Sequence, residues 1–257
     1  MTKLSKWYLD CVSESGDAVI GYHAWLEAAA LRLGYEGLLD RPSAGPTRVC
    51  HSLRPSAVSA SPDLVNWDTP GLGVRGRWLR RSAAVSEILF ASPEGTVEWE
   101  CHLPNAEAEI ELPGRSLAGL GYVERLRVTL SPWRLPIRQL RWGRFLSRRN
   151  TLVWIDWQGP FQTRLALLNG RRFDTAVIEN HSVSLPDGSR AAFDRAIVFR
   201  DASLGSTFLG AIPALERLAP ARFLLARESK WLSRSVLEVP GQAPDEAWAI
   251  HEEVRWP

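Results

Sequence analysis

Short β-type segments separated by tight-turn signals recur along the 257 residues, and they limit the possible fold more than any other feature. Turn sequences such as Asn169-Gly170 and Pro186-Asp187-Gly188 lie between runs of β-branched and aromatic residues. Long amphipathic helices do not alternate with these runs, so the pattern does not favour a parallel α/β sheet. It predicts an all-β protein.

We expect sixteen strands, which fall into two sets of eight. The first set covers residues 5–13, 18–27, 46–54, 74–80, 83–91, 95–103, 105–112 and 119–130. The second set covers residues 138–147, 150–158, 161–169, 171–180, 190–201, 221–229, 230–239 and 246–256. Residues 209–220 are expected to form a loop or one helical turn, and residues 25–33 could form a short helix.

Sixteen strands are too many for one small barrel, whereas two closed sheets of about eight strands accommodate them. Pro132 and Pro136 interrupt strand pairing between the two sets. We therefore expect two domains, residues 1–132 and 133–257, although no sequence repeat relates them.

Several function classes are disfavoured by composition. The three cysteines show no CxxC spacing, which argues against a disulfide framework and a zinc site. Nucleotide-binding and metalloprotease motifs are missing, so no cofactor is expected. A net charge of +2 does not favour nucleic-acid binding, and the arginine-rich run 134–149 fits the outer face of a strand. No apolar run approaches the roughly 18–20 residues of a membrane span, and no signal peptide is evident, so a cytoplasmic location is expected.

The chain contains twelve tryptophans, and this high number is the most informative feature of its composition. Tryptophan supplies large, rigid apolar walls, which suit a protein that encloses a hydrophobic small molecule. The alternative is that these side chains simply fill the barrel interiors. The expected partner is therefore a hydrophobic small-molecule ligand, and the sequence makes no prediction of the oligomeric state.

Three stretches carry a resemblance to a known family. They are Trp7-Tyr8 with Ala18-Val19-Ile20-Gly21-Tyr22, Gly119-Leu120-Gly121-Tyr122-Val123-Glu124, and Arg141-Trp142-Gly143-Arg144 with Val153-Trp154. The chain resembles the carotenoid 1,2-hydratase (hydroxyneurosporene synthase) and AttH-like family. The resemblance implies two tandem lipocalin-like β-barrel domains that use no metal or organic cofactor and act on hydrophobic polyenes by hydration or cyclisation. Glu124-Arg125-Leu126 stands where the family usually has Asp-His-Asn.

Strand alternation places acidic side chains among apolar ones. Glu124 shares a face with Tyr122 and Leu126, while the neighbouring arginines face away. A carboxyl group desolvated in an apolar cavity can keep its proton near neutral pH and act as an acid. We therefore expect Glu124 and Tyr122 to be catalytic; the alternative is that Glu124 pairs with an arginine or with the backbone.

The last strand repeats this pattern. Glu252 shares a face with Trp248 and Ile250, and it is a second candidate for an inward, catalytic acid. His251 then lies on the other face, where we expect it to be solvated or paired across strands.

The expected ligand contacts are aromatic, acidic and histidine side chains near these motifs. His51 shares a face with Val49 and Leu53, and His23 shares a face with Trp25, so both histidines are expected on a cavity wall. The complete set of candidates is Tyr8, Asp10, His23, Trp25, His51, Trp142 and Trp154.

Two functions remain open. The first is a cofactor-independent hydratase, or an isomerase or cyclase, that acts by acid catalysis on a polyene, isoprenoid or polyketide-like molecule. The second is a carrier that binds a hydrophobic metabolite without changing it.

Overall fold

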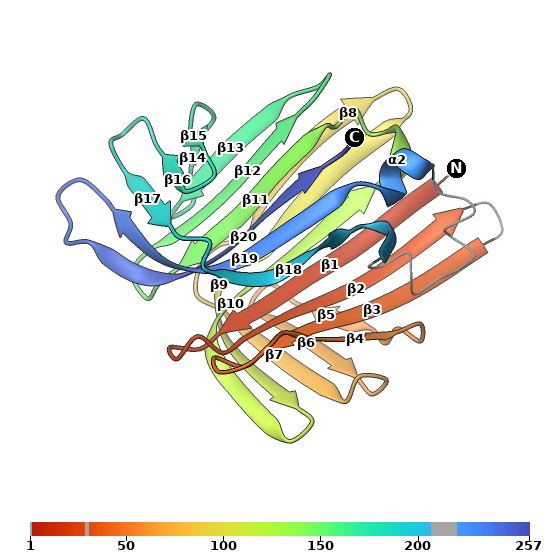
Figure 1. Ribbon diagram of the computed structural model, residues 1–257, viewed down its shortest axis with the longest axis horizontal. Coiled ribbons are helices and arrows are strands. Elements are labelled where there is room, and N and C mark those ends of the chain that lie inside the picture. The colour runs from red at the N-terminus through yellow and green to blue at the C-terminus, as the bar shows by residue number, and fades with distance from the viewer. Residues whose placement is uncertain (1, 29–30, 207–219) are drawn as a thin grey trace. The chain divides into compact units, whose positions relative to one another are not determined.

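The structure of the chain is a computed structural model that describes residues 2–28, 31–206 and 220–257. The chain divides into two compact units, Met1–Leu135 and Pro136–Pro257. Each unit contains one antiparallel sheet of ten strands (Figure 1). The predicted all-β class with two tandem lipocalin-like domains is therefore confirmed, although each sheet has ten strands and not about eight.

The strands of the N-terminal unit are β1 (Thr2–Val12), β2 (Ala18–Ala28), β3 (Leu31–Arg41), β4 (Arg48–Ser52), β5 (Val58–Ala60), β6 (Leu64–Thr69), β7 (Val74–Arg80), β8 (Val85–Ser92), β9 (Gly95–Leu112) and β10 (Arg115–Val128). Their order in the sheet is β4-β3-β2-β1-β10-β9-β7-β6-β5, and β8 also pairs with β9. A 3-10 turn, Pro132–Arg134, follows β10. The first strand of the unit therefore pairs with its last strand.

The C-terminal unit repeats this arrangement with β11 (Gln139–Leu146), β12 (Thr151–Gln158), β13 (Thr163–Leu168), β14 (Arg171–Phe173), β15 (Val177–Ile178), β16 (Ser182–Ser184), β17 (Arg190–Phe193), β18 (Ile197–Ser203), β19 (Arg227–Glu238) and β20 (Asp245–Arg255). A short helix, α2 (Ala221–Leu224), precedes β19. The strand order is β14-β13-β12-β11-β20-β19-β17-β16-β15, with β18 paired to β19. Each strand thus has a counterpart ten positions earlier in the chain order, although the sequence shows no repeat.

Apolar side chains fill the interior of the N-terminal sheet. The two largest are Trp67 on β6 and Trp78 on β7, which are almost fully buried. They pack against one face of β1, β2 and β10, which presents Trp7, Leu9, Cys11, Val19 and Val123. Gly21 permits this packing, since a Cβ atom there would lie 2.3 Å from the Trp67 ring.

The C-terminal sheet has an equivalent core. Its members include Phe145 on β11, Trp154 on β12, Phe193 on β17 and Ala249 on β20. A Cβ atom at Gly143 would lie 2.2 Å from the Trp154 ring, so glycine is required for this close packing.

Three segments differ from the sequence-based expectation. The prediction of a helix at residues 25–33 was wrong, because residues up to Ala28 belong to β2 and β3 begins at Leu31. The strands β3, β5, β6 and β16 were not predicted. The predicted strand at 221–229 begins instead with α2, whose N-cap is Pro220. Residues 209–219 of the predicted loop lie outside the described residues.

The strand β9 joins two predicted strands through Pro104. Its first half pairs with β8 and its second half with β7. The pairing with β10 shifts register between Val123 and Gly121, where Leu103 and Ala106 are the partners. The bulge places Pro104 outside the regular ladder, which explains why a proline is tolerated in this long strand.

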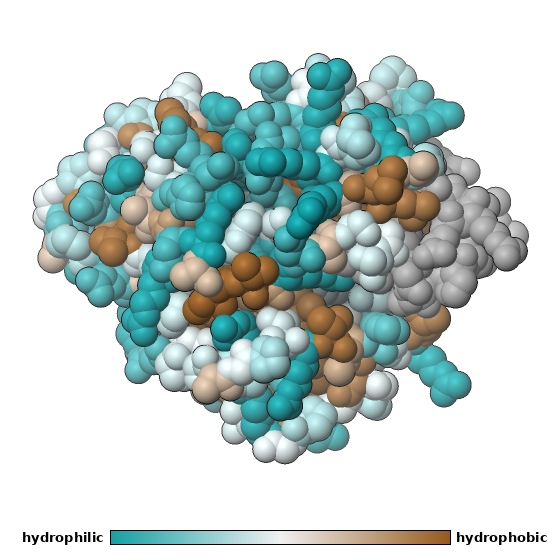
Figure 2. All heavy atoms as spheres, in the orientation of Figure 1, coloured by the Kyte–Doolittle hydropathy of each residue, from teal (hydrophilic) through white to brown (hydrophobic). Residues whose placement is uncertain are grey.

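The surface shown in Figure 2 is mostly hydrophilic, with apolar residues in separate patches. The exposed large apolar side chains include Ile88, Val177 and Val198. Within the described ranges, no helix combines the length and the apolar character that crossing a membrane requires.

Candidate functional site

A carboxylate held by two aromatic donors lies on β10. The Tyr122 hydroxyl donates a hydrogen bond of 2.6 Å to Glu124 Oε2, and the Trp99 indole N–H donates to the same oxygen. Tyr122 and Trp99 are buried, whereas Glu124 is half-buried. The two hydrogen bonds therefore fix the orientation of the carboxylate, while the Glu124 side chain stays partly exposed.

Three tyrosine rings form a chain of contacts that begins at this carboxylate with Tyr122. The Tyr8 ring lies 5.6 Å from Tyr22 and 6.0 Å from Tyr122, both in edge-on contact. Burial raises the pKa of the Tyr122 hydroxyl well above its usual value, and Cys101 and Glu124 add to the shift. Tyr122 therefore keeps its proton and acts as a hydrogen-bond donor.

Two further ionisable groups complete the cluster. Cys101 lies opposite Glu124 in the β9–β10 pair, and Asp10 lies opposite Tyr122 in the β1–β10 pair. Both side chains are fully buried. Burial raises the pKa of the Cys101 thiol well above its usual value; a hydrogen bond with Tyr122 opposes this shift, and the charges of Glu124 and Asp10 add to it. The thiol is thus protonated and is not a nucleophile at neutral pH.

The prediction that Glu124 faces the apolar interior of a barrel was wrong. The interior is packed by Leu9, Cys11 and Val123, which alternate with the residues of the cluster along β1 and β10. Tyr8, Asp10, Tyr122 and Glu124 therefore lie on the opposite face of the sheet. Both faces of these strands are buried and rich in apolar groups, so alternation alone did not identify the interior one.

A second acidic group lies on the interior side of the N-terminal sheet. Glu36 on β3 has no exposed surface, and its carboxylate accepts hydrogen bonds from the Ser56 hydroxyl (2.6 Å), the Ser56 backbone N–H (2.9 Å), the Thr69 hydroxyl (2.6 Å) and the Trp67 indole (3.3 Å). His23 Nδ1 lies 3.5 Å from Glu36 Oε1. Burial alone raises the pKa of Glu36, but hydrogen bonds from His23, Ser56 and Thr69 outweigh it and lower the pKa to about 2.

The structure brings His23 to this carboxylate, and sequence reasoning missed Glu36. A carboxylate at Nδ1 fixes the ring orientation and directs Nε2 away from Glu36. Trp25 is half-buried, with its ring 6.4 Å from His23 and the Arg32 guanidinium 4.2 Å from the Trp25 ring centre. Both predicted ligand contacts, His23 and Trp25, thus lie together on the interior side of β2.

The expectation for His51 was wrong. His51 is exposed on β4, and its neighbours Val49 and Leu53 are 57% and 48% exposed. The apolar alternation of this segment does not correspond to a buried face, so His51 does not lie on a cavity wall.

Glu252 occupies the position in the C-terminal sheet that Glu124 occupies in the N-terminal sheet. Glu252 on β20 lies opposite Trp142 on β11 and Lys230 on β19. In the same way, Glu124 on β10 lies opposite Tyr8 on β1 and Cys101 on β9. It forms an ion pair with Lys230, which is itself buried. Like Glu124, it lies on the face opposite the core, so the prediction of an inward acid was wrong here too.

His251 is buried, contrary to the expectation that it is solvated. Its Nε2 lies 2.9 Å from Ser233 Oγ, and rings of Trp231, Phe193 and Trp154 surround it at 5.3, 4.4 and 6.5 Å. Burial lowers the pKa of His251 to about 3, and the charge of Arg195 adds to this shift. The core of the C-terminal sheet includes Ala249 on the same face, so this face of β20 is the interior one.

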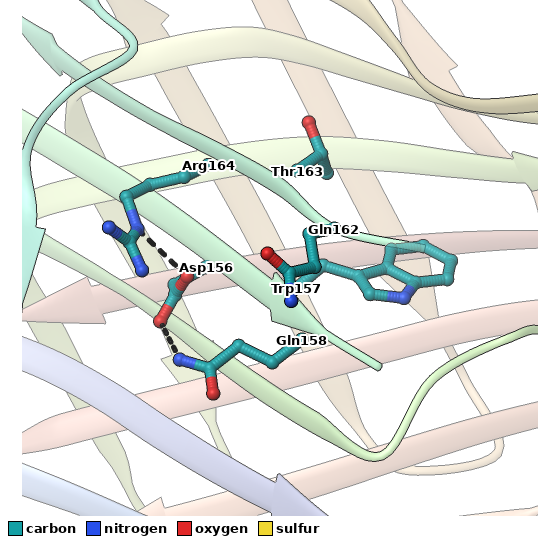
Figure 3. Close-up of a pocket in the computed structure, with 6 residues that line it drawn as sticks. All are labelled: Asp156, Trp157, Gln158, Gln162, Thr163 and Arg164. Carbon is teal, nitrogen blue, oxygen red and sulfur yellow. Dashed lines mark hydrogen bonds and ion pairs between the residues drawn. The ribbon is translucent and has the colours of Figure 1, made fainter. Parts of the chain in front are cut away.

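A polar pocket of about 380 Å³ lies at the β12–β13 hairpin (Figure 3). The Asp156 carboxylate lies in it, where Arg164 Nε donates a bond of 2.9 Å and Gln158 Nε2 one of 2.6 Å. Since its polar groups already bond to one another, the pocket offers few unsatisfied groups to a ligand. In the part of the chain that the structure describes, no group of three or more His, Cys, Asp or Glu side chains is arranged to hold a metal ion.

The sequence matches no family model, and no curated protein matches it either. Solved structures do match over nearly the whole chain. CghA, crystallised with Sch210972, has a TM-score of 0.57 at 11% identity. The match covers 99% of this chain and 88% of CghA. An AttH-like protein from Nitrosomonas europaea has a TM-score of 0.55 at 8% identity (98% of this chain, 91% of that one). Kievitone hydratase from Nectria haematococca has a TM-score of 0.54 at 9% identity (99% and 88%).

The chain shares the fold of these three proteins. The resemblance to the carotenoid 1,2-hydratase and AttH-like family is therefore confirmed for the fold. Identities of 8–11% carry no assignment of individual residues, so the roles of the side chains rest on their own geometry.

Proposed function

We propose that this chain is a cofactor-independent enzyme that moves a proton on an unsaturated, apolar small molecule, with Glu124 as the group that exchanges the proton. The observation that carries the proposal is the clamp of Tyr122 and Trp99 on Glu124 Oε2 within a cluster of buried aromatic rings. A carboxylate with fixed orientation beside apolar surface is suited to proton transfer to and from carbon.

The two donated hydrogen bonds favour the charged form of the carboxylate. The geometry therefore best supports a reaction that begins with proton removal by Glu124, as in a double-bond isomerisation. The C–H electron pair shifts the double bond by one position, and the proton on Glu124 returns to the far carbon. Tyr122 keeps its own proton and positions the carboxylate.

Hydration and cyclisation are variants of the same chemistry. In a hydration, protonated Glu124 gives its proton to one alkene carbon, water adds to the other, and the added water returns a proton to Glu124. The rings of Tyr8, Tyr22 and Tyr122 would stabilise the cationic intermediate, with each such contact contributing roughly 0.5–2 kcal/mol. The shared fold with kievitone hydratase and with CghA supports action on a small organic molecule.

Deuterium incorporation tests this proposal. The protein and its Glu124→Gln variant are incubated in D2O with an organic extract of the cells that produce the protein, and the extract is analysed by high-resolution mass spectrometry. We expect at least one apolar compound to gain deuterium with the wild-type protein, and this gain to fall by about two orders of magnitude with Glu124→Gln.

Glu252→Gln is the matched control, since it removes the acid at the equivalent position of the other sheet. It should leave deuterium incorporation within about twofold of wild type. The outcome that contradicts the enzyme and supports the carrier has three parts. The protein co-purifies with an apolar compound, no deuterium enters that compound, and the Glu124→Gln variant binds it as tightly as the wild-type protein does.

A further inference from the structure

Four arginines and two carboxylates form a charged group on the interior side of the C-terminal sheet. Asp156 pairs with Arg164 at 2.9 Å and with Arg141 at 3.5 Å. Glu253 pairs with Arg141 at 3.2 Å and with Arg255 at 3.0 Å. Figure 3 shows one end of this group, with Asp156 beside Arg164. Every carboxylate here is thus already shared by two guanidinium groups.

Arg195 is the fourth guanidinium, and it is not paired in this way. It lies in the loop between β17 and β18, is half-buried, and its Nε is buried without an acceptor among the described residues. Burial lowers the pKa of Arg195; Glu253 opposes the shift, and the charges of Arg141 and Arg255 add to it. A buried guanidinium N–H without an acceptor costs free energy.

Apolar surface lies directly beside Arg195. Its guanidinium carbon is 4.0 Å from the centre of the Trp231 ring, and Trp231 in turn stacks on His251 at 5.3 Å. Val198, three residues after Arg195, is the cross-strand neighbour of Trp231 and is 52% exposed. A half-buried cation thus lies next to an exposed apolar side chain and an aromatic ring.

The neighbouring histidine, His251, adds no charge to this group. Ser233 Oγ donates to the backbone oxygen of Asp194 at 2.8 Å, so His251 Nε2–H is the donor in the bond with Ser233. Burial lowers the pKa of His251 to about 3, so the ring is neutral at pH 7 and adds no positive charge. The excess charge of the described group, four guanidiniums against two carboxylates, belongs to the arginines.

We propose that this part of the C-terminal unit binds the carboxylate of an apolar monocarboxylic acid. The carboxylate oxygens accept hydrogen bonds from Arg195, for which the planar guanidinium is well matched, and the hydrocarbon part lies over Val198 and the edge of Trp231. The site belongs to the C-terminal unit, whereas Glu124 belongs to the N-terminal unit, and the proposal does not depend on the function proposed above.

Isothermal titration calorimetry with two probes tests the site. The probes are 2-naphthoate and 2-naphthalenemethanol, which have the same ring system with and without the charge. We expect 2-naphthoate to bind the wild-type protein about tenfold or more tightly than the alcohol, and Arg195→Gln to weaken 2-naphthoate about tenfold with little effect on the alcohol. Equal affinity of the two probes for the wild-type protein would overturn the proposal.

The chain offers a matched control in Arg234, which also stacks on a tryptophan, at 4.7 Å from the Trp248 ring, but is exposed on the same strand as Trp231. Arg234→Gln should leave 2-naphthoate binding within about twofold, and an equal loss in both variants would show a general charge effect and overturn the site. If Arg195→Gln fails to fold by circular dichroism, Arg195→Lys carries the test, with an expected loss of about threefold or more. Glu124→Gln should bind 2-naphthoate as wild type does, which separates failure of this site from failure of the proposed enzyme.

Discussion

Ser233 Oγ lies 2.9 Å from His251 Nε2, and both side chains are buried in the C-terminal sheet. Ser233 gives its own proton to the backbone oxygen of Asp194, so the imidazole must supply the proton in this bond. The arrangement differs from a nucleophilic serine, in which the hydroxyl donates to histidine. The pair therefore fixes the neutral ring of His251 among Trp231, Phe193 and Trp154.

The first prediction is that His251 makes the stability of the fold fall in mild acid. The pKa of His251 is about 3 in the folded chain against a usual value of 6.5, so between these values only the unfolded chain takes up the proton. The free energy of unfolding is therefore unaffected by this group above pH 6.5. It decreases as the pH falls from 6.5 toward 3, by as much as about 5 kcal/mol in total. Urea denaturation at pH 7, 5.5 and 4 measures it.

His251→Gln should remove most of this pH dependence, because glutamine keeps a donor for Ser233 but does not titrate. His51→Gln is the control, since His51 is exposed. A wild-type slope that survives in His251→Gln would show that other groups cause the acid sensitivity.

A second prediction concerns Glu36, whose effect appears in a lower pH range. Its pKa of about 2 lies below the usual 4.5, so its stabilisation is present above pH 4.5 and is lost as the pH falls toward 2. The shift corresponds to about 3 kcal/mol. Glu36→Gln should therefore be less stable than wild type at pH 7 by roughly this amount, and the difference should shrink between pH 4.5 and 2. A constant difference across this range would contradict the assignment.

A third prediction follows from the buried hydroxyl of Tyr122. Because burial raises its pKa well above the usual value of 10, Tyr122 should not ionise while the protein is folded. Absorbance at 295 nm during alkaline titration counts ionised tyrosines, and the amplitude near pH 10 should be the same for wild type and Tyr122→Phe. A smaller amplitude in the variant would show that Tyr122 titrates in the folded state.

A fourth prediction tests the packing of the C-terminal core. Gly143→Ala places a Cβ atom 2.2 Å from the Trp154 ring and 2.7 Å from His251 Cβ. Neither neighbour can move without disturbing the core, so we expect a loss of about 2 kcal/mol or more in the free energy of unfolding. Thermal denaturation monitored by circular dichroism measures the loss, and an unchanged midpoint would show that the core is looser than described.

Turn residues and strand alternation predicted much of the fold. The pairs Tyr122 with Glu124 and Trp248 with Glu252 do share faces, as their spacing indicated. The choice of the interior face could not be made in this way, because the alternating residue Val123 is as apolar as its neighbours and only the packing of distant strands identifies its side as the core.

The missed residues have physical reasons as well. Glu36 belongs to β3, which contains Gly34 and Gly37 and therefore lacks a continuous β-type pattern. Its donors Ser56 and Thr69 lie 20 and 33 positions further along the chain, so no local signal predicts these hydrogen bonds. The burial of His251 likewise depends on Trp154 and Phe193, which only the sheet brings near.

The pairing of the first strand with the last in each unit has a consequence for how such chains arise and can be altered. Leu4 lies opposite Val128, and Gln139 lies opposite Arg255, so each unit begins and ends on neighbouring strands. Circular permutation is therefore open to either half: a short linker can join the old ends, and new ends can be cut in a hairpin turn such as residues 13–17, with every described strand pair retained. Two successive units that arrange their strands in the same order are the expected product of a tandem gene duplication whose sequences have since diverged beyond recognition.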